Sequence, residues 1–194
     1  MKEKNIKVET LDGSNRRLVY EAAALLHGVF ASISPNAWPT FESAVAEVEQ
    51  SLSDDRISIV AASNKKVIGW IGGIRQYNGN AYELHPLVVD PSFQRQGIGS
   101  MLVEALEAKV HSRGAMTIYL GSDDEQGRTS LSGIDLYPDV LTKLKEMRNL
   151  HCHPYEFYLK KGFSIVGVVP DANGYGKPDI IMAKRVTGEK NGGV

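Results

Sequence analysis

The segment at residues 94–100, Gln-Arg-Gln-Gly-Ile-Gly-Ser, constrains the fold of this chain more than any other feature. It follows an apolar run at residues 87–89, which is typical of a β-strand, and precedes a helical pattern over residues 101–111. Glycines between the end of a strand and the start of a helix allow backbone N–H groups to turn toward an anion. The helix dipole favours phosphate at the same place. The segment therefore predicts a loop that binds a pyrophosphate group.

The spacing of the glycines distinguishes three kinds of phosphate-binding loop. A Walker loop needs a lysine after its second glycine, and none follows Gly99; a dinucleotide-binding loop needs a third glycine where Leu102 stands. The remaining pattern, Gln-x-x-Gly-x-Gly after a strand, resembles the acetyl-CoA loop of the GCN5-related N-acetyltransferases, the GNAT superfamily. This resemblance implies an acetyl-CoA cosubstrate, whose pyrophosphate is held by Gln94, Arg95, Gln96, Gly97, Ile98, Gly99 and Ser100.

Length and composition favour one globular domain. The chain has 194 residues, and we expect a single domain over residues 1–186 with a flexible tail over 187–194. Lys and Arg number 22 against 23 Asp and Glu, so no basic excess argues for nucleic acid or a membrane surface. The single cysteine, Cys152, forms no internal disulfide, which favours a cytoplasmic location. No residue pattern suggests a metal.

The hydrophobic periodicity predicts an α/β protein. Strands are expected over residues 6–11, 57–62, 67–76, 81–90, 116–121, 163–169 and 179–185, and helices over 15–30 with Ser14 as N-cap, from 41 to about 52, over 101–111, 138–150 and 154–162. This order predicts a central mixed sheet of about seven strands with helices on both faces. It is the GNAT fold that the glycine-rich loop suggests.

A proline inside a predicted strand marks a break in the sheet. Pro86 cannot donate to a strand ladder, so it belongs at an edge or at a bulge. A break there would splay this strand from its parallel neighbour over residues 116–121. In GNAT proteins such a gap admits the pantetheine arm of acetyl-CoA, which implies that Leu87, Val88 and Val89 bind the cosubstrate. The alternative is a proline on an ordinary edge strand.

Three side chains of the same strand share one face of the sheet. Glu83, His85 and Leu87 lie two residues apart, so they face the same way. Acetyl transfer to an ammonium requires its deprotonation, and Glu83 could take that proton directly or through water. The backbone N–H near Leu87 could hold the carbonyl oxygen as charge develops. His85 is either a second donor or a structural histidine.

The segment His153–Phe163 is the second part of the sequence that points to catalytic chemistry. A short helix that carries tyrosines and ends in Gly-Phe is another hallmark of the GNAT proteins. The resemblance implies that Tyr158 faces the sulfur and protonates the departing thiolate. Tyr155, three residues earlier, lies nearly on the same helix face. For both residues the alternative is a buried structural tyrosine.

A closer resemblance extends over about half of the chain. It is to the aminoglycoside 6′-N-acetyltransferases and is carried by residues 83–89, 118–124, 135–137, 149–150, 153–158, 170–174, 177–180 and 182–184. A polycationic aminoglycoside requires carboxylates around its amines. The substrate residues expected here are Trp38, which could pack on a sugar face, and Glu83, Asp123, Asp124 and Asp179. The alternative is that the acidic loops are merely solvated.

These observations predict an acetyltransferase that moves acetyl from acetyl-CoA directly to the 6′-amine of an aminoglycoside, which would confer antibiotic resistance. Two alternatives stay open: an enzyme that acetylates another small amine or a peptide amine, and a non-catalytic acyl-CoA-binding sensor. Members of the resembled family often pair as dimers, and exposed strand edges permit a homodimer here.

Overall fold

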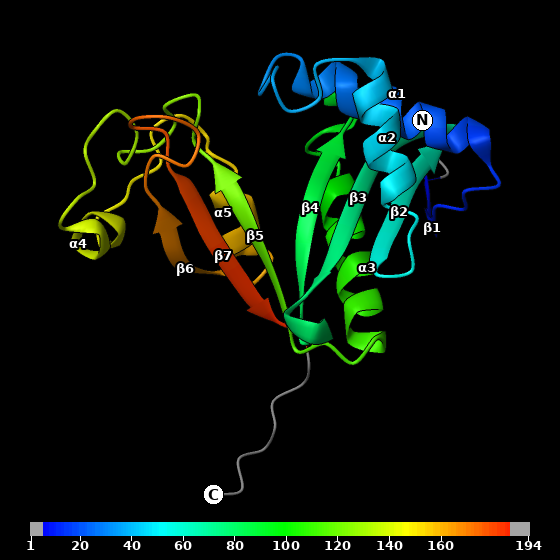
Figure 1. Cartoon of the computed structure of the whole chain (residues 1–194). Coiled ribbons are helices and arrows are strands. Elements are labelled where there is room, and N and C mark those ends of the chain that lie inside the picture. The colour runs from blue at the N-terminus through cyan, green and yellow to red at the C-terminus, as the bar shows by residue number, and fades with distance from the viewer. Residues whose placement is uncertain (1–5, 187–194) are drawn as a thin grey trace, which may run out of the picture. The chain divides into compact units, whose positions relative to one another are not determined.

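A computed structural model describes residues 6–186, which divide into two compact units (Figure 1). The first unit reaches Ile118 and includes Val186, and the second runs from Tyr119 to Arg185. The single domain expected over residues 1–186 stays a prediction. The tail expected over 187–194 lies outside the described residues.

The elements follow the predicted order. The first unit contains β1 (Ile6–Thr10), α1 (Arg16–Phe30), α2 (Phe41–Gln50), β2 (Arg56–Ser63), β3 (Lys66–Gln76), η1 (Tyr77–Gly79), β4 (Ala81–Val89), η2 (Pro91–Phe93) and α3 (Ile98–Ser112). After β5 (Thr117–Asp123), which begins in the first unit, the second unit contains α4 (Val140–Lys145), α5 (Tyr155–Lys160), β6 (Ser164–Val169) and β7 (Asp179–Arg185). The strand order is β1-β2-β3-β4-β5-β7-β6 in one seven-stranded sheet. The predicted fold class is confirmed.

Side-chain capping fixes the starts of the first two helices. Asn15, rather than the expected Ser14, caps α1, because its side chain accepts a hydrogen bond from the N–H of Leu18 at 3.4 Å. At α2 the hydroxyl of Thr40 accepts from the N–H of Ser43 at 3.1 Å, and the Ser43 hydroxyl accepts from the N–H of Thr40 at 3.2 Å. A cap of this kind typically contributes about 1 kcal/mol.

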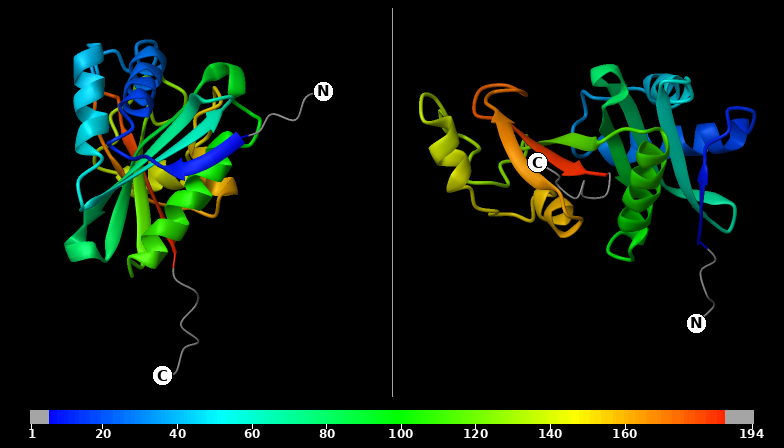
Figure 2. Two further views of the ribbon diagram at one scale, coloured as in Figure 1. Left: turned by 90° about the vertical axis from the view of Figure 1, so that its right-hand side faces the viewer. Right: turned by 90° about the horizontal axis from the view of Figure 1, so that it is seen from below.

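Helices cover both faces of the strands in the first unit (Figures 1 and 2). Trp70 of β3 pairs with Val60 of β2 on one side and with Val88 of β4 on the other, and all three belong to one buried cluster. Leu26 of α1 and Val48 of α2 belong to the same cluster and are 0% exposed. The amphipathic stripes of α1 and α2 thus complete the core on this face, as the sequence periodicity predicts.

On the opposite face, glycines of β3 allow α3 to lie unusually close. A Cβ at Gly69 would lie 2.8 Å from the Cδ1 of Leu102, and one at Gly73 would lie 2.8 Å from the Cδ1 of Leu106. Both leucines are 0% exposed. Because any side chain at these glycines would push α3 outward, the close packing fixes the position of the helix and of the loop that precedes it.

The proline of β4 lies at a bulge. His85 and Pro86 stand together opposite Gly72 of β3, between regular pairing that stops at Leu84 and resumes at Leu87. A Cβ at Gly72 would collide with the carbonyl oxygen of His85, so glycine is needed opposite the extra residue. Because β4 lies between β3 and β5 in the strand order, the edge alternative is excluded. The parting of the following strands at the acetyl-CoA site stays a prediction.

In the second unit, the helix expected over residues 138–150 is wrong in extent. α4 ends at Lys145, and the chain then turns back to pair with an earlier loop. Thr129 and Asn149 form an isolated antiparallel bridge, and the N–H of Leu150 donates to the carbonyl of Arg128 at 2.8 Å. This non-local pairing overrides the local helical pattern.

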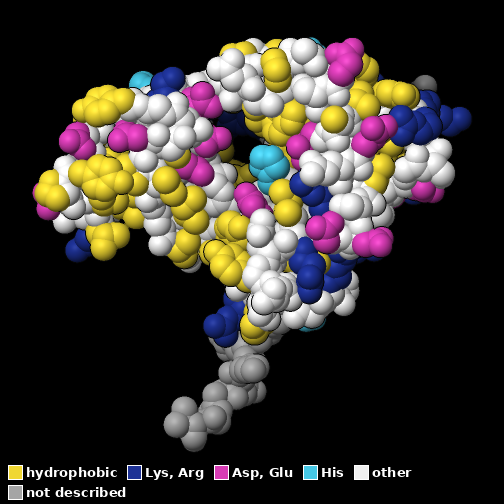
Figure 3. Space-filling model, viewed as in Figure 1, with side chains coloured by type: hydrophobic (Ala, Val, Ile, Leu, Met, Phe, Trp, Pro, Cys, Tyr) yellow, Lys and Arg dark blue, Asp and Glu magenta, His cyan; other side chains and the backbone are white. Residues whose placement is uncertain are grey.

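The second unit exposes many large apolar side chains. Figure 3 shows hydrophobic side chains gathered on the surface near α4 and β6. The exposed large apolar side chains of this unit are Ile134, Tyr137, Leu141, Leu150, Leu159, Val166, Val169 and Tyr175.

Candidate active site

The loop before α3 has the backbone conformation of an anion-binding site. Gly97 is the N-cap of α3 with φ +87°, a left-handed conformation that favours glycine. No atom lies within 4 Å of a Cβ built on Gly97, so the residue is required by its conformation and not by lack of space. Residues 94–97 are exposed. The first N–H groups of a helix have no acceptor within that helix, so they face outward at this point.

Side chains brace this loop against its own backbone. The Nε2 of Gln94 donates to the carbonyl of Val89 at 3.2 Å, and the Nε2 of Gln96 donates to the carbonyl of Ser92 at 2.9 Å. The Oδ1 of Asp90 accepts from the hydroxyl and the N–H of Ser92 at 2.6 and 2.9 Å. The hydroxyl contact holds the pKa of Asp90 below its usual value. The two glutamines therefore organise the loop, whose backbone supplies the donors.

The strand β4 carries the side chains expected to act on the acetyl group, and Glu83, His85 and Leu87 are half-buried. Glu83 pairs with Ile74 of β3, whereas Leu87 pairs with Ile71, three residues away, because the bulge adds one residue to β4 between them. The single face that the i, i+2, i+4 spacing predicts for Glu83 and Leu87 is therefore wrong: the two side chains lie on opposite faces of the sheet. The Oε2 of Glu83 accepts from the Nε2 of Gln76 at 3.4 Å, a long hydrogen bond from the neighbouring strand β3.

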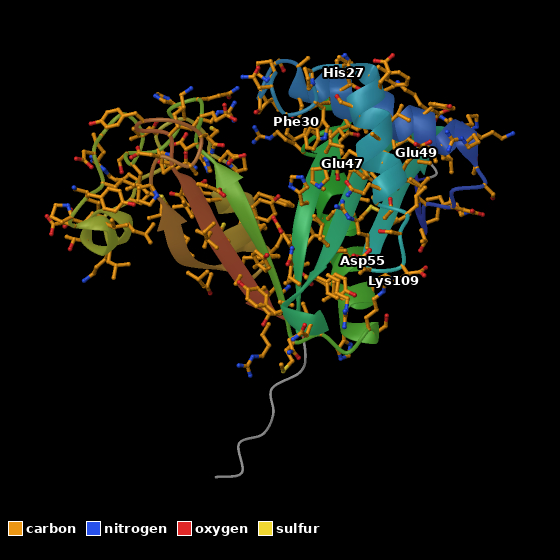
Figure 4. All side chains as sticks on the ribbon, in the orientation of Figure 1. His27, Phe30, Glu47, Glu49, Asp55 and Lys109 are labelled. Atoms are coloured by element: carbon orange, nitrogen blue, oxygen red, sulfur yellow. The ribbon has the colours of Figure 1, made fainter. Side chains whose placement is uncertain are left out.

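Trp38 and His85, which are distant in sequence, lie together in the first unit. Their ring centroids are 5.8 Å apart, and Trp38 makes an edge contact with Phe30 at 4.8 Å. The Nδ1 of His27 lies 3.0 Å from the carbonyl oxygen of Trp38. His27 and Phe30 both belong to α1 (Figure 4). Trp38 is only 8% exposed, so it belongs to the core beside His85. Its stacking on a sugar face stays a prediction.

Tyr158 lies in an aromatic setting in the second unit. Its ring is 5.1 Å from that of Phe157 and 5.6 Å from that of Phe163, both at a steep angle. The side chain is 8% exposed, and burial raises the pKa of its phenol well above the usual range. The hydroxyl is therefore protonated at neutral pH. It can donate a proton but is a poor base.

His153 organises the segment that leads into α5. Its Nδ1 accepts from the N–H of Tyr155 at 3.2 Å, and its Nε2 lies 3.0 Å from the carbonyl oxygen of Asp123. This pair of contacts requires the neutral tautomer with the proton on Nε2. Asn149 adds two contacts to the His153 backbone, at 2.8 and 3.1 Å. Burial lowers the pKa of the His153 imidazole despite the opposing carbonyl contact.

The two consecutive aspartates after β5 have different surroundings. Asp124 is 1% exposed, and its carboxylate accepts from the N–H of Arg128 at 2.6 Å and from the N–H and hydroxyl of Thr129 at 2.8 and 2.7 Å. It therefore holds its own loop together. Asp123 is exposed, and its Oδ1 accepts from the Nδ2 of Asn173 at 2.7 Å. Of the two, Asp123 has the exposure that a substrate ligand needs.

Asp179 begins β7 and lies against β5. Its carboxylate occupies the space where a side chain of Gly121 would project. The N–H of Asp124 donates to the carbonyl of Pro178 at 3.0 Å, which brings the end of β5 beside the start of β7. Asp179 is half-buried. Within the second unit, the structure therefore brings Asp123 and Asp179 to the same end of two neighbouring strands.

Sequence reasoning missed several organising residues in the second unit. His153 and Asn173 fix loops through hydrogen bonds to the distant Asp123, and Asn149 and Thr129 do so through hydrogen bonds to residues four and five positions away. Their only signal in the sequence is that most of them fall in the stretches that carry the family resemblance. Gly121 gave no signal of its own, because its role depends on a residue 58 positions later, at 179.

The described part of the chain, residues 6–186, contains neither a cluster of metal ligands nor a helix suited to a membrane. In that part of the chain, no three side chains of His, Cys, Asp or Glu gather as a metal site would require. None of its helices combines the length and the apolar character needed to span a bilayer.

The family model of the acetyltransferase (GNAT) family matches residues 25–132, more than half of the chain. The chain belongs to the GNAT family of acetyltransferases. No curated protein sequence matched it.

Three solved structures are similar over nearly the full chain. An aminoglycoside 6′-N-acetyltransferase complexed with coenzyme A is 40% identical over 95% of this chain and 99% of its own, with a TM-score of 0.87. The aminoglycoside 6′-N-acetyltransferase from Enterococcus faecium is 40% identical over the same shares, with a TM-score of 0.86. Aminoglycoside 6′-acetyltransferase type Ii is 37% identical over 94% of this chain and 99% of its own, with a TM-score of 0.71.

Proposed function

We propose that this enzyme transfers the acetyl group of acetyl-CoA directly to the 6′-amino group of aminoglycoside antibiotics. The observation that carries the proposal is the near-full-length likeness to solved aminoglycoside 6′-N-acetyltransferases. The family membership supports acetyl transfer, and the likeness to a structure complexed with coenzyme A supports the cosubstrate.

The residues of the loop fit the diphosphate of coenzyme A. The backbone at Gly97, Ile98, Gly99 and Ser100 opens α3, where donors and dipole favour a doubly charged anion. Gln94 and Gln96 hold the loop in shape, and the exposed Arg95 adds a positive charge. When bound, acetyl-CoA supplies an acetyl group activated as a thioester. Leu87, Val88 and Val89 bind its pantetheine arm in this proposal.

Residues of β4 activate the amine and stabilise developing charge. Glu83 takes a proton from the substrate ammonium, directly or through water, which frees the nitrogen lone pair for attack. The backbone N–H of Leu87 donates to the carbonyl oxygen as it gains charge. His85 is positioned by Trp38, which leaves it either to add a second donor or to shape this surface.

Tyr158 completes the proton balance. The departing sulfur leaves as a thiolate, which must take up a proton to become the free thiol. The phenol of Tyr158 is kept protonated by burial, so it donates this proton, and it regains one from the amine nitrogen, which loses its second proton on becoming an amide. No acyl-enzyme is needed, and the exposed Cys152 has no part in the reaction.

Carboxylates bind the other amines of the drug. In this proposal Asp123, which is exposed, and Asp179 and Glu83, which are half-buried, take this role. Asp124 supports this binding indirectly, because its carboxylate fixes the loop that follows β5. Acetylation removes one positive charge and one strong donor from the drug. The drug then binds ribosomal RNA less tightly, because that binding depends on charge, and the cell becomes resistant.

The cellular setting and assembly are part of the same proposal. A cytoplasmic location suits an enzyme that uses acetyl-CoA and carries one free cysteine. A homodimer would cover part of the apolar surface of the second unit. Light scattering of the purified protein measures this directly, and a monomeric mass at micromolar concentration would remove the dimer from the proposal.

A pair of matched drugs tests the proposed reaction. Neomycin and paromomycin differ in one group, which is a 6′-amine in neomycin and a 6′-hydroxyl in paromomycin. With acetyl-CoA, the enzyme is expected to release free thiol rapidly with neomycin, kanamycin and tobramycin and far more slowly with paromomycin. Equal rates for the matched pair would contradict the 6′ assignment. If no aminoglycoside caused thiol release, two alternatives would remain: an enzyme that acetylates another amine, and a non-catalytic sensor that binds acyl-CoA.

A further inference from the structure

Gly121 of β5 lies beneath the carboxylate of Asp179. A Cβ built on Gly121 would lie 2.8 Å from the Cγ and Oδ1 of Asp179, and closer still to Oδ2. Real Cβ atoms do not approach other atoms so closely. The φ of Gly121 lies outside the left-handed region, so its backbone would accept any residue. Glycine is therefore needed at this position for space alone.

The backbone of Asp179 is fixed, so its carboxylate has few other places to lie. Asp179 pairs with Val169 of β6 at the first register position of β7. The carbonyl of the preceding Pro178 accepts from the N–H of Asp124 at 3.0 Å. An aspartate has only one methylene group between its backbone and its carboxylate. Where the side chain lies therefore depends on what stands opposite it on β5.

The position of this carboxylate relates it to Asp123. Residues 121 and 123 of β5 lie two apart and share a face of the sheet, about 7 Å apart along the strand. Asp123 is held in place by Asn173 at 2.7 Å. With the carboxylate of Asp179 lying over Gly121, both negative charges stand on one face at the end of β5.

We propose that Gly121 is a positioning residue for aminoglycoside recognition, because its missing side chain lets the carboxylate of Asp179 lie on β5, where it binds an ammonium group of the drug. This inference rests on the proposed function. An alanine at position 121 would push the carboxylate aside without disturbing the conformation of the strand. A charge-assisted hydrogen bond that loses its geometry weakens drug binding by about tenfold.

The test compares steady-state kinetics of four variants of the full-length enzyme. Gly121→Ala is expected to raise the KM for neomycin about tenfold, with kcat and the Kd for acetyl-CoA little changed. Asp179→Asn is expected to raise the KM to a similar degree. The double variant is expected to be no worse than Asp179→Asn alone, because Gly121 acts only through that carboxylate. Gly167→Ala is the control, since Gly167 lies on β6 with open space around its Cβ, and it should behave as wild type.

Several outcomes would overturn the inference. These are an unchanged KM for Gly121→Ala or for Asp179→Asn, fully additive effects in the double variant, or an equal increase for Gly167→Ala. An inactive wild-type enzyme would reject the proposed function and this inference with it. A normally active wild type beside an unaffected Gly121→Ala would reject the inference alone. If Gly121→Ala fails to fold, Asp179→Glu makes the same test: its longer side chain carries the carboxylate past Gly121, and an unchanged KM would contradict the proposal.

Discussion

Tyr158 has the surroundings that a proton donor to sulfur requires. Aromatic rings of Phe157 and Phe163 border it, and little of its side chain is exposed. Burial disfavours the charged phenolate, so the pKa rises and the proton stays on the oxygen. The proton is therefore present on Tyr158 over the whole physiological range of pH, and its transfer is driven by the thiolate that forms, because the raised pKa makes the phenol itself a weaker acid.

Replacing Tyr158 by phenylalanine removes the proton and keeps the packing. The kcat is expected to fall by about 10²-fold, the usual contribution of a positioned acid, while the Kd for acetyl-CoA stays unchanged. Because the folded-state pKa lies above the usual 10, the wild-type kcat should not decline through loss of this proton as pH rises from 7 to 10. Full turnover by Tyr158→Phe in a stopped-flow thiol assay would shift the acid role to another group.

His153 is a structural residue whose neutral form the fold favours. Both ring nitrogens have partners that suit the neutral form, and a second proton would set an N–H of the ring against the N–H of Tyr155. Burial lowers the pKa of the imidazole from 6.5, so the unfolded chain binds the proton more readily than the folded chain. Stability from this residue is therefore complete above pH 6.5 and is lost as pH falls from there through the lower folded-state pKa.

Urea unfolding at pH 7.5 and at pH 5.5 measures this loss. The free energy of unfolding of the wild type is expected to drop between the two values by more than that of His153→Gln, because glutamine keeps polar contacts but does not titrate there. The difference between the two proteins isolates His153 from the other histidines. Identical pH dependence in the two proteins would show that the imidazole is not held neutral.

At the scale of elements, the start of α3 is the feature that restricts the amino-acid sequence most strictly. Two independent requirements meet there: the glycines of β3 set how closely the helix approaches the sheet, and Gly97 sets how the loop enters it. The first is a matter of volume and the second of backbone conformation. Both place helix N–H groups where a diphosphate would be bound.

Gly97→Ala tests the conformational requirement by itself, since its Cβ would meet no atom within 4 Å. A non-glycine residue at φ +87° is strained by about 1–2 kcal/mol, so both thermal stability and acetyl-CoA affinity should fall, the latter about tenfold. Gly28→Ala is the matched control. It also adds a Cβ in open space but lies within α1, where alanine stabilises a helix by about 0.5–1 kcal/mol. Calorimetric titration with acetyl-CoA contradicts the account if both variants bind as the wild type does.

The elements also show how far the sequence can be read. The glycine-rich loop and the proline bulge could be predicted because Gly and Pro restrict the backbone locally. The extent of α4 could not, because residues 148–150 pair with residues 128–130 and this contact has no local signal. Helical periodicity over 138–150 gave the wrong length for that reason.

The candidate site also has features that the sequence predicts and features that it does not. The spacing of Glu83 and Leu87 predicted one shared face, and this was wrong, because spacing alone does not count the residue that the bulge adds between them. The difference between Asp123 and Asp124 could not be predicted, because neighbours in sequence differ only through their partners Asn173 and Thr129. Long-range contacts of this kind decide which carboxylate is free to meet a substrate.

At the scale of the whole molecule, the chain divides its proposed chemistry between two compact units. The first supplies the loop before α3 and the β4 side chains, and the second supplies Tyr158 and the carboxylates near β5 and β7. β5 is continuous in sequence from one unit to the next. Both units are present in the three similar structures, which cover nearly the full chain.

The position of the acetyl group on the product tests the central claim most directly. Neomycin incubated with the enzyme and acetyl-CoA would be purified and examined by two-dimensional NMR. The account predicts one added acetyl group, on the nitrogen at carbon 6′, with the other amines unmodified. Acetylation at a different nitrogen, or a drug recovered unchanged while coenzyme A still binds, would contradict it.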